Sequence, residues 1–242
     1  MTELAEVINE HSTGVIVTDP PRAEAAAVSA LAGYGVATVH EALGRTGCLG
    51  PGLRPIQQGV RVCGTAVTVL CRPGDNLMVH AAVEQCREGD LMVVTTTSPC
   101  TDGLFGELFA TALQARGVRG LVINAGVRDT AELRAMGFPV WSAAVCAQGT
   151  VKASPGSVNV PVVVGGQVIR PGDAILADDD GVMCVPRDLV ATAVQAAVAR
   201  TAKEEASRAA FAAGELGLDR YGLRETLERL GVRYVKAEEH DG

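Results

Sequence analysis

The sequence predicts an α/β fold: a single layered domain in which helices flank a central mixed, partly parallel sheet, followed by a C-terminal helical arm. In the middle of the chain, apolar Val, Leu and Ile runs alternate with Ala-rich segments, and this β-loop-α rhythm indicates parallel strands. Residues 158–186 contain short apolar runs and tight turns, with Gly165-Gly166 as a hairpin signal. No linker divides the chain, and the expected boundaries are 1–187 for the α/β domain and 188–242 for the arm.

The first elements are two helices and a strand. The stretch PRAEAAAVSALAGYG predicts a helix that starts near Pro21 and ends at the glycines 33 and 35. A second short helix is expected over 36–44. Residues 59–71 are rich in Val and Thr at strand period, and Gly64 within them indicates a bulge or a close contact.

A turn signature occurs three times, as RPGD at 72–75, REGD at 87–90 and RPGD at 170–173. Gly-Asp after Pro or Glu is typical of a turn, and each copy precedes an apolar element. The irregular spacing argues against a repeat protein. Asp75 or Asn76 can cap the helix that follows the first copy, and a buried strand, LMVVTTT, follows the second.

The central segment continues the alternation. A glycine-flanked loop at the start of 103–118 leads into a helix, and RGLVINAGV at 119–127 is the next strand. A helix is expected over 130–138 and a short strand at PVWS. The tail forms a long Ala-rich helix over 188–213 with charges on one side.

Composition excludes several classes of protein. The net charge of −7 and the absence of a basic run argue against nucleic-acid binding, which needs Lys and Arg to neutralise phosphates. No run of roughly 20 apolar residues exists to span a membrane. The acidic start of the chain has no hydrophobic signal region, so a cytoplasmic location is expected.

Residue usage also bears on packing and redox state. Aromatic residues make up 3% of the chain against 48% hydrophobic residues overall, which favours tight backbone packing and subunit contacts, hence an oligomer. The seven cysteines are odd in number and contain no C-x-x-C pair, so reduced thiols are expected rather than a zinc site.

Two segments could carry chemistry, because ligands of parallel sheets bind where strands end and helices begin. One is DGLFGELF, and the other is NAGVRD after Ile123. A helix N-terminus beside Arg128 would bind a small carboxylate through unpaired N–H groups and a bidentate guanidinium. Asp129 supplies a hard oxygen ligand suited to Mg²⁺ or Mn²⁺. Together they suggest a site for an α-keto acid chelated to a divalent metal.

A plainer, structural interpretation of the same residues is also open. Asp129 would cap the following helix beside a solvated Arg128, and Glu107 would be a first-turn acid that satisfies a helix dipole. Spacing alone favours this second interpretation.

The stretch GLFGELFATALQARGVRGLVINAGVRDTAELRAMGFPVWS resembles the core motif of the class II pyruvate aldolases that act on 4-hydroxy-4-methyl-2-oxoglutarate or 4-carboxy-4-hydroxy-2-oxoadipate. That family shares its fold with the regulator of ribonuclease activity A. The resemblance extends over nearly the whole chain, through GVATVHEALGRTG and CGTAVTVLCRPGDNLMVHAAVEQCREGD to GTVKASPGSVNVPVVVGGQVIRPGDAILADDDGVMCVP. The segment AAGELGLDRYGLRETLERLGVRYV is typical of the aldolase branch.

The resemblance implies a role for each matching residue. Arg128 would bind the pyruvoyl group, and Asp129 would be the direct metal ligand. Backbone amides of a four-residue loop would hold the pyruvate carboxylate: Gly106, Glu107, Leu108 and Phe109. The acid of this loop would reach the metal through water.

The chain departs from the family pattern at two of these positions. Glu107 stands where Asp is usual, and Phe109 stands where Leu is usual. The resemblance also implies a catalytic glutamate that reaches in from the neighbouring subunit. It falls on the arm at Glu204, and the register leaves Glu205 as the alternative.

The implied reaction is a retro-aldol cleavage that depends on a divalent metal. Cleavage gives pyruvate plus oxaloacetate, or pyruvate twice, through an enolate whose charge a chelated Mg²⁺ or Mn²⁺ would stabilise. Glu107 and Glu204 would polarise the water that takes the proton of the C4 hydroxyl. Oxaloacetate decarboxylation would be a side activity, aromatic-acid catabolism the setting, and a homo-oligomer, a trimer or hexamer with sites between subunits, the assembly.

Other candidates receive plainer interpretations. Lys152 is expected to be a surface lysine on a turn rather than a Schiff-base lysine. Cys100 lacks an evident histidine base, so nucleophilic catalysis is not expected of it. Arg72 could bind a distal carboxylate of the substrate.

The histidines and the acidic run are also assigned structural roles. His80 and His40 are expected to be buried structural histidines, with a substrate contact open to His80. His11 and His240 lie near the termini. DDDG at 178–181 is expected to join two strands rather than to bind a metal.

Two other functions remain open. A regulatory protein that inhibits a ribonuclease by protein contact would share the fold and dispense with metal chemistry. A decarboxylase or hydratase of another α-keto acid would keep the site and change the reaction, and the departure at Glu107 leaves room for it.

Overall fold

The computed structural model describes residues 14–237, and the chain forms two compact units, one ending at Ala197 and the other beginning at Val198. His11 and His240 lie outside the described residues. The helices are α2 (Ala25–Leu31), α3 (Val36–Ala42), α4 (Leu77–Gln85), α5 (Glu107–Gln114), α6 (Thr130–Ala135), the 3₁₀ helix η1 (Arg187–Leu189), α7 (Val190–Ala212), α8 (Gly217–Arg220) and α9 (Leu223–Arg229).

All strands within residues 14–237 belong to the first unit. They are β1 (Val15–Ile16), β2 (Arg54–Pro55), β3 (Val62–Cys71), β4 (Asp90–Thr96), β5 (Gly103–Phe105), β6 (Gly120–Val127), β7 (Val140–Val145), β8 (Ser157–Val158), β9 (Val162–Val164), β10 (Gln167–Ile169), β11 (Ala174–Asp178) and β12 (Gly181–Val185).

The main sheet is mixed, as the sequence predicts. Its central strands β3, β4, β6 and β7 are parallel neighbours, and β5 pairs in parallel with β6. Antiparallel strands β11 and β12 extend from β3, and β2 pairs antiparallel with β7. The carboxyl ends of the parallel strands therefore meet at one edge, where the loops to α5 and α6 begin.

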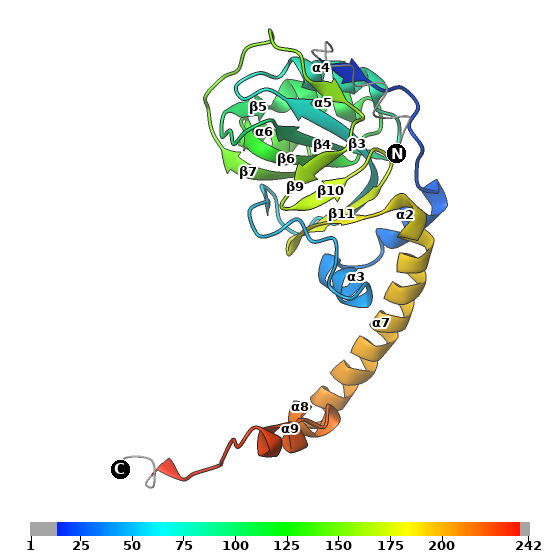
Figure 1. The fold of residues 1–242 in the computed structure, drawn as a ribbon, viewed down its shortest axis with the longest axis vertical. Helices are drawn as coiled ribbons and strands as arrows, with labels where there is room; N and C mark the ends of the chain where they lie inside the picture. The colour runs from blue at the N-terminus through cyan, green and yellow to red at the C-terminus, as the bar shows by residue number, and fades with distance from the viewer. Residues whose placement is uncertain (1–13, 238–242) are drawn as a thin grey trace. The chain divides into compact units, whose positions relative to one another are not determined.

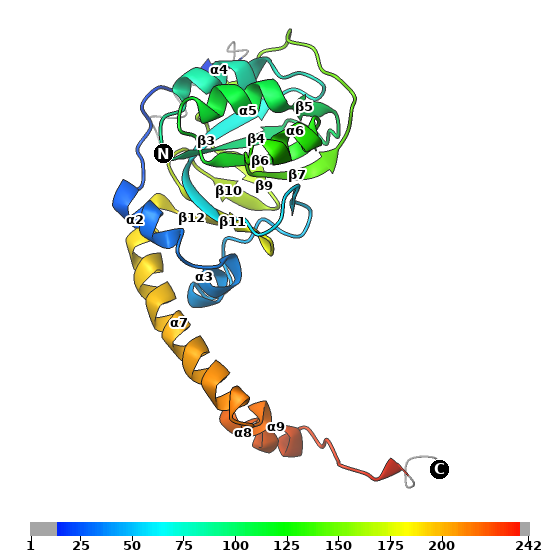
Figure 2. The ribbon, with the colours of Figure 1, turned by 180° about the vertical axis from the view of Figure 1, so that it is seen from behind.

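Each face of the sheet has its own cover. Helices α4, α5 and α6 lie over one face, and the hairpin β9–β10 lies over the other (Figure 1, Figure 2). The alternation of side chains along each strand explains the division: Val67 and Val69 pack toward the helices, whereas Ala66 packs toward the hairpin. A third cluster joins α2, α3 and β11–β12 to the first turns of α7.

The predicted turns are confirmed. Gly165 and Gly166 have φ of 57° and 79° and connect β9 to β10, which suits the two-residue turn of a hairpin. In all three Gly-Asp turns the aspartate N–H donates to the carbonyl of the arginine three residues earlier. The glycine before each aspartate has a positive φ, a conformation that costs glycine little.

Some element boundaries differ from the prediction. The first helix begins at Ala25 rather than near Pro21, because the preceding segment is extended and Ala23 N–H donates to the carbonyl of Gly172 at 2.9 Å. The loop expected before α5 contains the short strand β5.

The second unit is helical. Phe211 of α7 packs edge-on against Tyr221 with ring centroids 5.9 Å apart, and the guanidinium of Arg220 lies 6.0 Å from the Phe211 ring. Arg220 also donates to the Ser207 hydroxyl at 3.1 Å. No helix within residues 14–237 combines the length and apolar character needed to cross a membrane.

Candidate active site

A cavity of about 270 Å³ lies at the connections from β5 to α5 and from β6 to α6. Its lining comes from α4, the β5–α5 junction, the end of β6 and a later loop. The lining residues are Asn76, His80, Val83, Gly103, Leu104, Phe105, Gly106, Leu108, Phe109, Ala112, Arg128, Asp129 and Lys152. The structure thus brings the Arg-Asp pair and most of the predicted carboxylate-binding loop to one cavity.

Gly106 allows this convergence by its small size. A Cβ atom built on Gly106 would lie 2.3 Å from Oδ2 of Asp129 and 3.2 Å from Cγ of Arg128. The backbone of Gly106 is extended, so the requirement is for space rather than for a special φ. The Arg-Asp pair that follows β6 therefore packs directly on the N-terminus of α5.

Asp129 occupies the N-cap position of α6 in the left-handed conformation, with φ of 55°. Its side chain makes no capping bond to α6, which contradicts the simple capping interpretation. Instead the backbone N–H of Glu107 donates to Oδ2 of Asp129 at 3.1 Å, and Nε of Arg128 lies 3.8 Å from the same oxygen. The carboxylate thus faces the neighbouring helix and the cavity, with 41% of the side chain exposed.

The start of α5 forms the second wall of the cavity. Gly106 is its N-cap, and the first in-helix bond runs from Ala110 N–H to the carbonyl of Gly106. Helix geometry leaves the amides of Leu108 and Phe109 without carbonyl partners inside the helix. Unpaired amides at the positive end of a helix dipole favour an anion, which suits a substrate carboxylate.

Glu107 shares this helix start, but its carboxylate points elsewhere. Oε1 of Glu107 accepts a hydrogen bond from the hydroxyl of Thr111 at 2.8 Å, one turn further along α5. Glu107 is not among the residues that line the cavity. Its backbone amide serves the site by holding Asp129, whereas its side chain lies along the helix.

Three polar residues outside the predicted motifs also line the cavity: Asn76, His80 and Lys152. His80 is exposed to the cavity, which corrects its assignment as a buried structural histidine. Asn76 and His80 are four residues apart at the start of α4, so they share a face of that helix. The spacing of four residues therefore indicates, from the sequence alone, that the two side chains lie together.

An aromatic contact sets the environment of His80. Its ring centroid lies 4.4 Å from that of Phe109, which in turn stacks on Phe105 at 5.5 Å. Partial burial lowers the pKa of His80, and the nearby charge of Lys152 lowers that pKa further. The neutral imidazole, which can both donate and accept, is therefore the favoured form at neutral pH.

Asp75 anchors the loop that carries Lys152. Its buried carboxylate accepts hydrogen bonds from the N–H groups of Leu77, Ala153 and Ser154, at 2.8, 2.8 and 2.6 Å. The first of these satisfies the start of α4, as predicted for this residue. The other two hold the loop against that helix, so Lys152 reaches the cavity through a long-range contact.

The remaining sequence candidates lie outside the cavity lining. These are Arg72, Cys100 and His40. The DDDG run joins β11 to β12, as predicted, and Asp178 accepts the N–H of Val36 at 2.9 Å. Glu204 belongs to the second unit, where Nε of Arg200 donates to its Oε1 at 2.8 Å; Glu205 contacts Arg208.

The cavity suits a divalent ion that relies little on protein ligands. No group of three or more His, Cys, Asp or Glu side chains in the described part of the chain is placed to hold a metal. Mg²⁺ commonly takes only one or two carboxylates and completes its shell with water and substrate oxygens. Asp129, half-exposed at the cavity, supplies a hard oxygen of this kind, so the residues present fit such an ion.

Comparisons with known proteins agree with this fold. A relative from Halalkalibacterium halodurans, provisionally named 4-hydroxy-4-methyl-2-oxoglutarate aldolase, is 30% identical over 70% of this chain and 80% of its own. A Burkholderia multivorans protein with the same provisional name is 37% identical over 59% of this chain and 86% of its own.

A solved structure and a family description complete the comparison. The crystal structure of a Streptomyces coelicolor protein, described as an unusual member of the RraA family of RNase ES inhibitors, aligns with a TM-score of 0.69 at 28% identity. The alignment covers 78% of this chain and 99% of that one. Residues 36–184 match the family described as Aldolase/RraA, and the chain therefore belongs to the RraA-like family.

Proposed function

We propose that this protein is a class II pyruvate aldolase, a carbon–carbon lyase that depends on Mg²⁺ or Mn²⁺. The proposed substrate is 4-carboxy-4-hydroxy-2-oxoadipate or 4-hydroxy-4-methyl-2-oxoglutarate, cleaved to pyruvate plus oxaloacetate or to two pyruvates. The observation that carries the proposal is the convergence of Arg128, Asp129 and the N-terminus of α5 on one cavity.

Each of these groups has a task in the reaction. The amides of Leu108 and Phe109 receive the pyruvate carboxylate at the helix N-terminus. Arg128, whose side chain is 48% exposed, offers donors to the 2-oxo oxygen, where negative charge develops as the C3–C4 bond breaks. Asp129 would hold the ion, which when bound supplies positive charge that stabilises the enolate oxygen.

The rim of the cavity suits the rest of a polycarboxylate substrate. Lys152 brings a positive charge to the lining, so it is a better candidate for a distal carboxylate than Arg72. Neutral His80 lies close enough to the cavity to hydrogen-bond the C4 hydroxyl or the departing oxo group. Glu204 of a neighbouring subunit in a trimer or hexamer remains our candidate for polarising the water that accepts the hydroxyl proton. Glu107 could assist only after its carboxylate leaves the hydroxyl of Thr111 and turns to the cavity.

The direct test is to follow pyruvate release from both aldols and from oxaloacetate with added Mg²⁺ or Mn²⁺. We expect turnover of at least one aldol, a slower decarboxylation of oxaloacetate, and loss of both in EDTA with recovery on adding the metal. Undiminished aldol cleavage in EDTA would point to a lysine Schiff base instead. If the protein decarboxylates or hydrates another α-keto acid and cleaves neither aldol, the proposed site stands but the proposed reaction is wrong.

A second candidate function is regulation of a ribonuclease by direct contact, which the Streptomyces coelicolor relative favours by its description. Such a role does not need a metal at Asp129. Inhibition of a ribonuclease that persists in an Asp129→Asn variant, with no pyruvate released by the wild type, would favour this candidate over the aldolase.

A further inference from the structure

A second cavity, of about 350 Å³, lies at the opposite edge of the parallel strands from the active-site cavity. Its lining includes Thr65, near the start of β3, and residues that directly precede β4 and β6. Strands β4 and β6 contain seven and eight residues, so the two edges are separated by ~20 Å at about 3.3 Å per residue. The second cavity is therefore a separate site.

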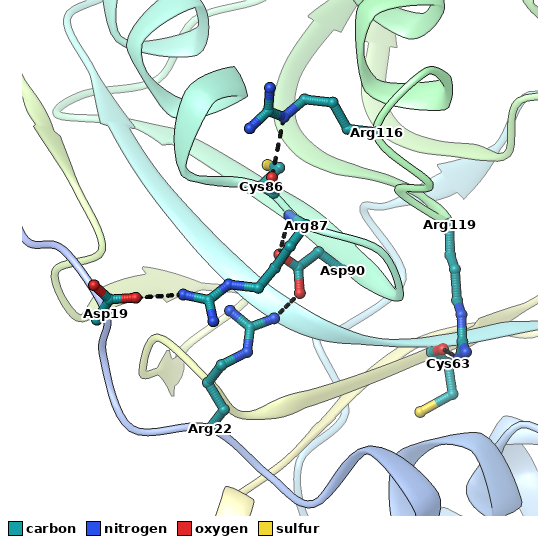
Figure 3. A network of polar contacts seen from close by, with 8 residues as sticks. All are labelled: Asp19, Arg22, Cys63, Cys86, Arg87, Asp90, Arg116 and Arg119. Atoms are coloured by element: carbon teal, nitrogen blue, oxygen red, sulfur yellow. Dashed lines mark hydrogen bonds and ion pairs between the residues drawn. The ribbon is translucent and has the colours of Figure 1, made fainter.

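Three arginines from three chain segments line this cavity: Arg22, Arg87 and Arg119. Arg22 precedes α2, Arg87 begins a Gly-Asp turn, and Arg119 directly precedes β6. Figure 3 shows the side chains of Arg22 and Arg87 close together beside Asp90. Among the described residues that line the cavity, three arginines accompany one acid, Glu88. The acids that pair with Arg22 and Arg87 are not lining residues.

A buried aspartate holds the three segments together. The side chain of Asp90 is fully buried and forms an ion pair with the guanidinium of Arg22. The same carboxylate accepts the backbone N–H of Arg87 at 2.9 Å (Figure 3). The Asp90 carbonyl accepts the N–H of Arg119 at 2.7 Å. The negative charge of Asp90 is thus neutralised by Arg22 beneath the cavity. The same aspartate fixes the positions of the segments that carry the three arginines.

The guanidinium groups retain donors beyond these contacts. Each carries five N–H donors, whereas Nη1 and Nη2 of Arg119 are engaged by the Cys63 carbonyl and the Ser29 hydroxyl, and Nη2 of Arg87 by Asp19. Asp19 is 85% exposed, so its ion pair with Arg87 is weak and open to competition from another anion.

The electrostatic environment of Arg22 also favours a bound anion. Its side chain is 21% exposed. Burial lowers the pKa of the Arg22 guanidinium, and the positive charge of Arg87 lowers it further. An anion in the cavity would relieve the repulsion between these two cations.

We propose that this arginine-lined cavity binds a small dianionic oxyanion, namely a phosphate group, either free or carried by a small metabolite. Guanidinium forks match the oxygens of phosphate bidentately, and three arginines line this one cavity. The hydroxyl of Ser29, which also lines the cavity, is a further donor. The site is independent of the proposed aldolase reaction, because it shares no lining residue with the active-site cavity.

The test is a calorimetric titration of the full-length protein with inorganic phosphate, and separately with glycerol 3-phosphate, at constant ionic strength set by chloride. We expect saturable binding of one anion per chain. Arg87→Gln and Arg119→Gln should each weaken it by about tenfold or more, equivalent to about 1.4 kcal/mol. Arg22 is spared, because its loss would leave Asp90 buried without a partner. The two titrations distinguish the sources, since the tighter ligand identifies a free phosphate or a phosphate ester.

Two control variants locate the bound anion. Arg54→Gln removes a positive charge on β2, outside both cavities, and should leave binding unchanged, as should Arg128→Ala in the active site. Binding lost in Arg128→Ala but kept in Arg87→Gln and Arg119→Gln would move the anion to the active site and overturn the proposal. Absence of saturable binding, or binding indifferent to both cavity variants, would overturn it as well, whether or not the protein is an aldolase.

Discussion

The backbone N–H of Glu107 donates a hydrogen bond to Oδ2 of Asp129 at 3.1 Å, so the first residue of α5 is tied to the residue that begins α6. The contact fixes the carboxylate at the positive end of α5 rather than at that of its own helix. An acid held in this way presents its remaining oxygen surface to the cavity. Because an amide oxygen at residue 129 can accept the same hydrogen bond, the charge of this side chain can be tested separately from its position.

Asp129→Asn should abolish turnover while leaving the fold intact. The asparagine Oδ1 can still accept the N–H of Glu107, so the substitution removes the negative charge and keeps the hydrogen bond. We expect a fall in kcat of ~10²-fold or more, the range seen when one group that stabilises transition-state charge is lost. The measurement is steady-state pyruvate release together with a thermal melt. Activity near that of the wild type would eliminate Asp129 as the metal ligand.

Arg128→Ala should cause nearly as large a loss. The variant removes the guanidinium at the cavity while keeping the backbone N–H that donates to the Phe105 carbonyl at 2.9 Å. Arg128→Lys restores the charge but not the bidentate fork, so it should recover only part of the activity. Full recovery in the lysine variant would show that a point charge is sufficient at this position.

Gly106→Ala should impair both activity and stability, because the added methyl group would lie 2.3 Å from Oδ2 of Asp129. Displacing the Arg-Asp pair would cost about 1–3 kcal/mol of unfolding free energy, the usual range for overpacking. Gly52→Ala is the matched control, since nothing lies within 4 Å of a Cβ built there and its φ is not positive. Equal denaturation midpoints and equal activities for the two variants would contradict the packing argument.

Local patterns in the sequence predicted much of the fold. The Gly165-Gly166 hairpin and the three Gly-Asp turns follow from backbone preferences that neighbouring residues determine. The start of α2 does not follow from such local preferences, because the segment before it is held extended by Gly172, about 150 residues away in the chain. Helix propensity depends on neighbouring residues alone, so it predicts a start near Pro21 rather than at Ala25.

Part of the candidate site could likewise be predicted from local sequence, and part depends on tertiary contacts. Arg128, Asp129 and the α5 loop belong to continuous motifs, and the structure brings them to one cavity. Lys152 is exposed, as predicted for a surface lysine on a turn, but its place in the cavity lining was not predicted. Its loop is bound to α4 through Asp75, and only the tertiary contact brings it to the cavity.

Asp75 should contribute stability that depends on pH. Burial alone would raise the pKa of its carboxyl group, but the N–H groups of Leu77, Ala153 and Ser154 outweigh burial and lower the pKa below its usual value. A carboxyl with a lowered folded-state pKa stabilises the protein above the unfolded-state pKa of about 3.9, and this contribution disappears as pH falls through the folded-state pKa. Asp75→Asn should therefore melt lower than the wild type at pH 7.

The pH dependence separates this charge effect from a simple loss of packing. The difference in melting temperature between wild type and Asp75→Asn should shrink as pH falls below about 4, because the carboxyl of the unfolded protein is protonated first and that of the folded protein at lower pH. A difference that stays constant from pH 7 to pH 3 would assign the loss to geometry alone. In the same variant we expect KM to rise more than kcat falls, because the loop that carries Lys152 is loosened.

His80 should titrate below the value of about 6.5 that is usual for a free histidine. Burial is the first cause of its lowered pKa and the charge of Lys152 the second, so each can be removed separately. Lys152→Gln removes the charge and should raise the pKa, whereas Lys152→Arg keeps the charge and should leave it low. Phe109→Leu takes away the ring at 4.4 Å and should raise the pKa by admitting water.

The measurement is the chemical shift of the His80 ring protons against pH, assigned by comparison with His80→Gln. A lowered pKa means that the neutral imidazole is lost as pH falls through that value, so an activity that needs neutral His80 should decline on the acid side at the same pH. Lys152→Gln should then move the acid limb of kcat/KM upward together with the titration. An acid limb that stays in place while the His80 pKa moves would exclude His80 as the group that controls it, because the two must shift together if the imidazole contacts the reacting substrate.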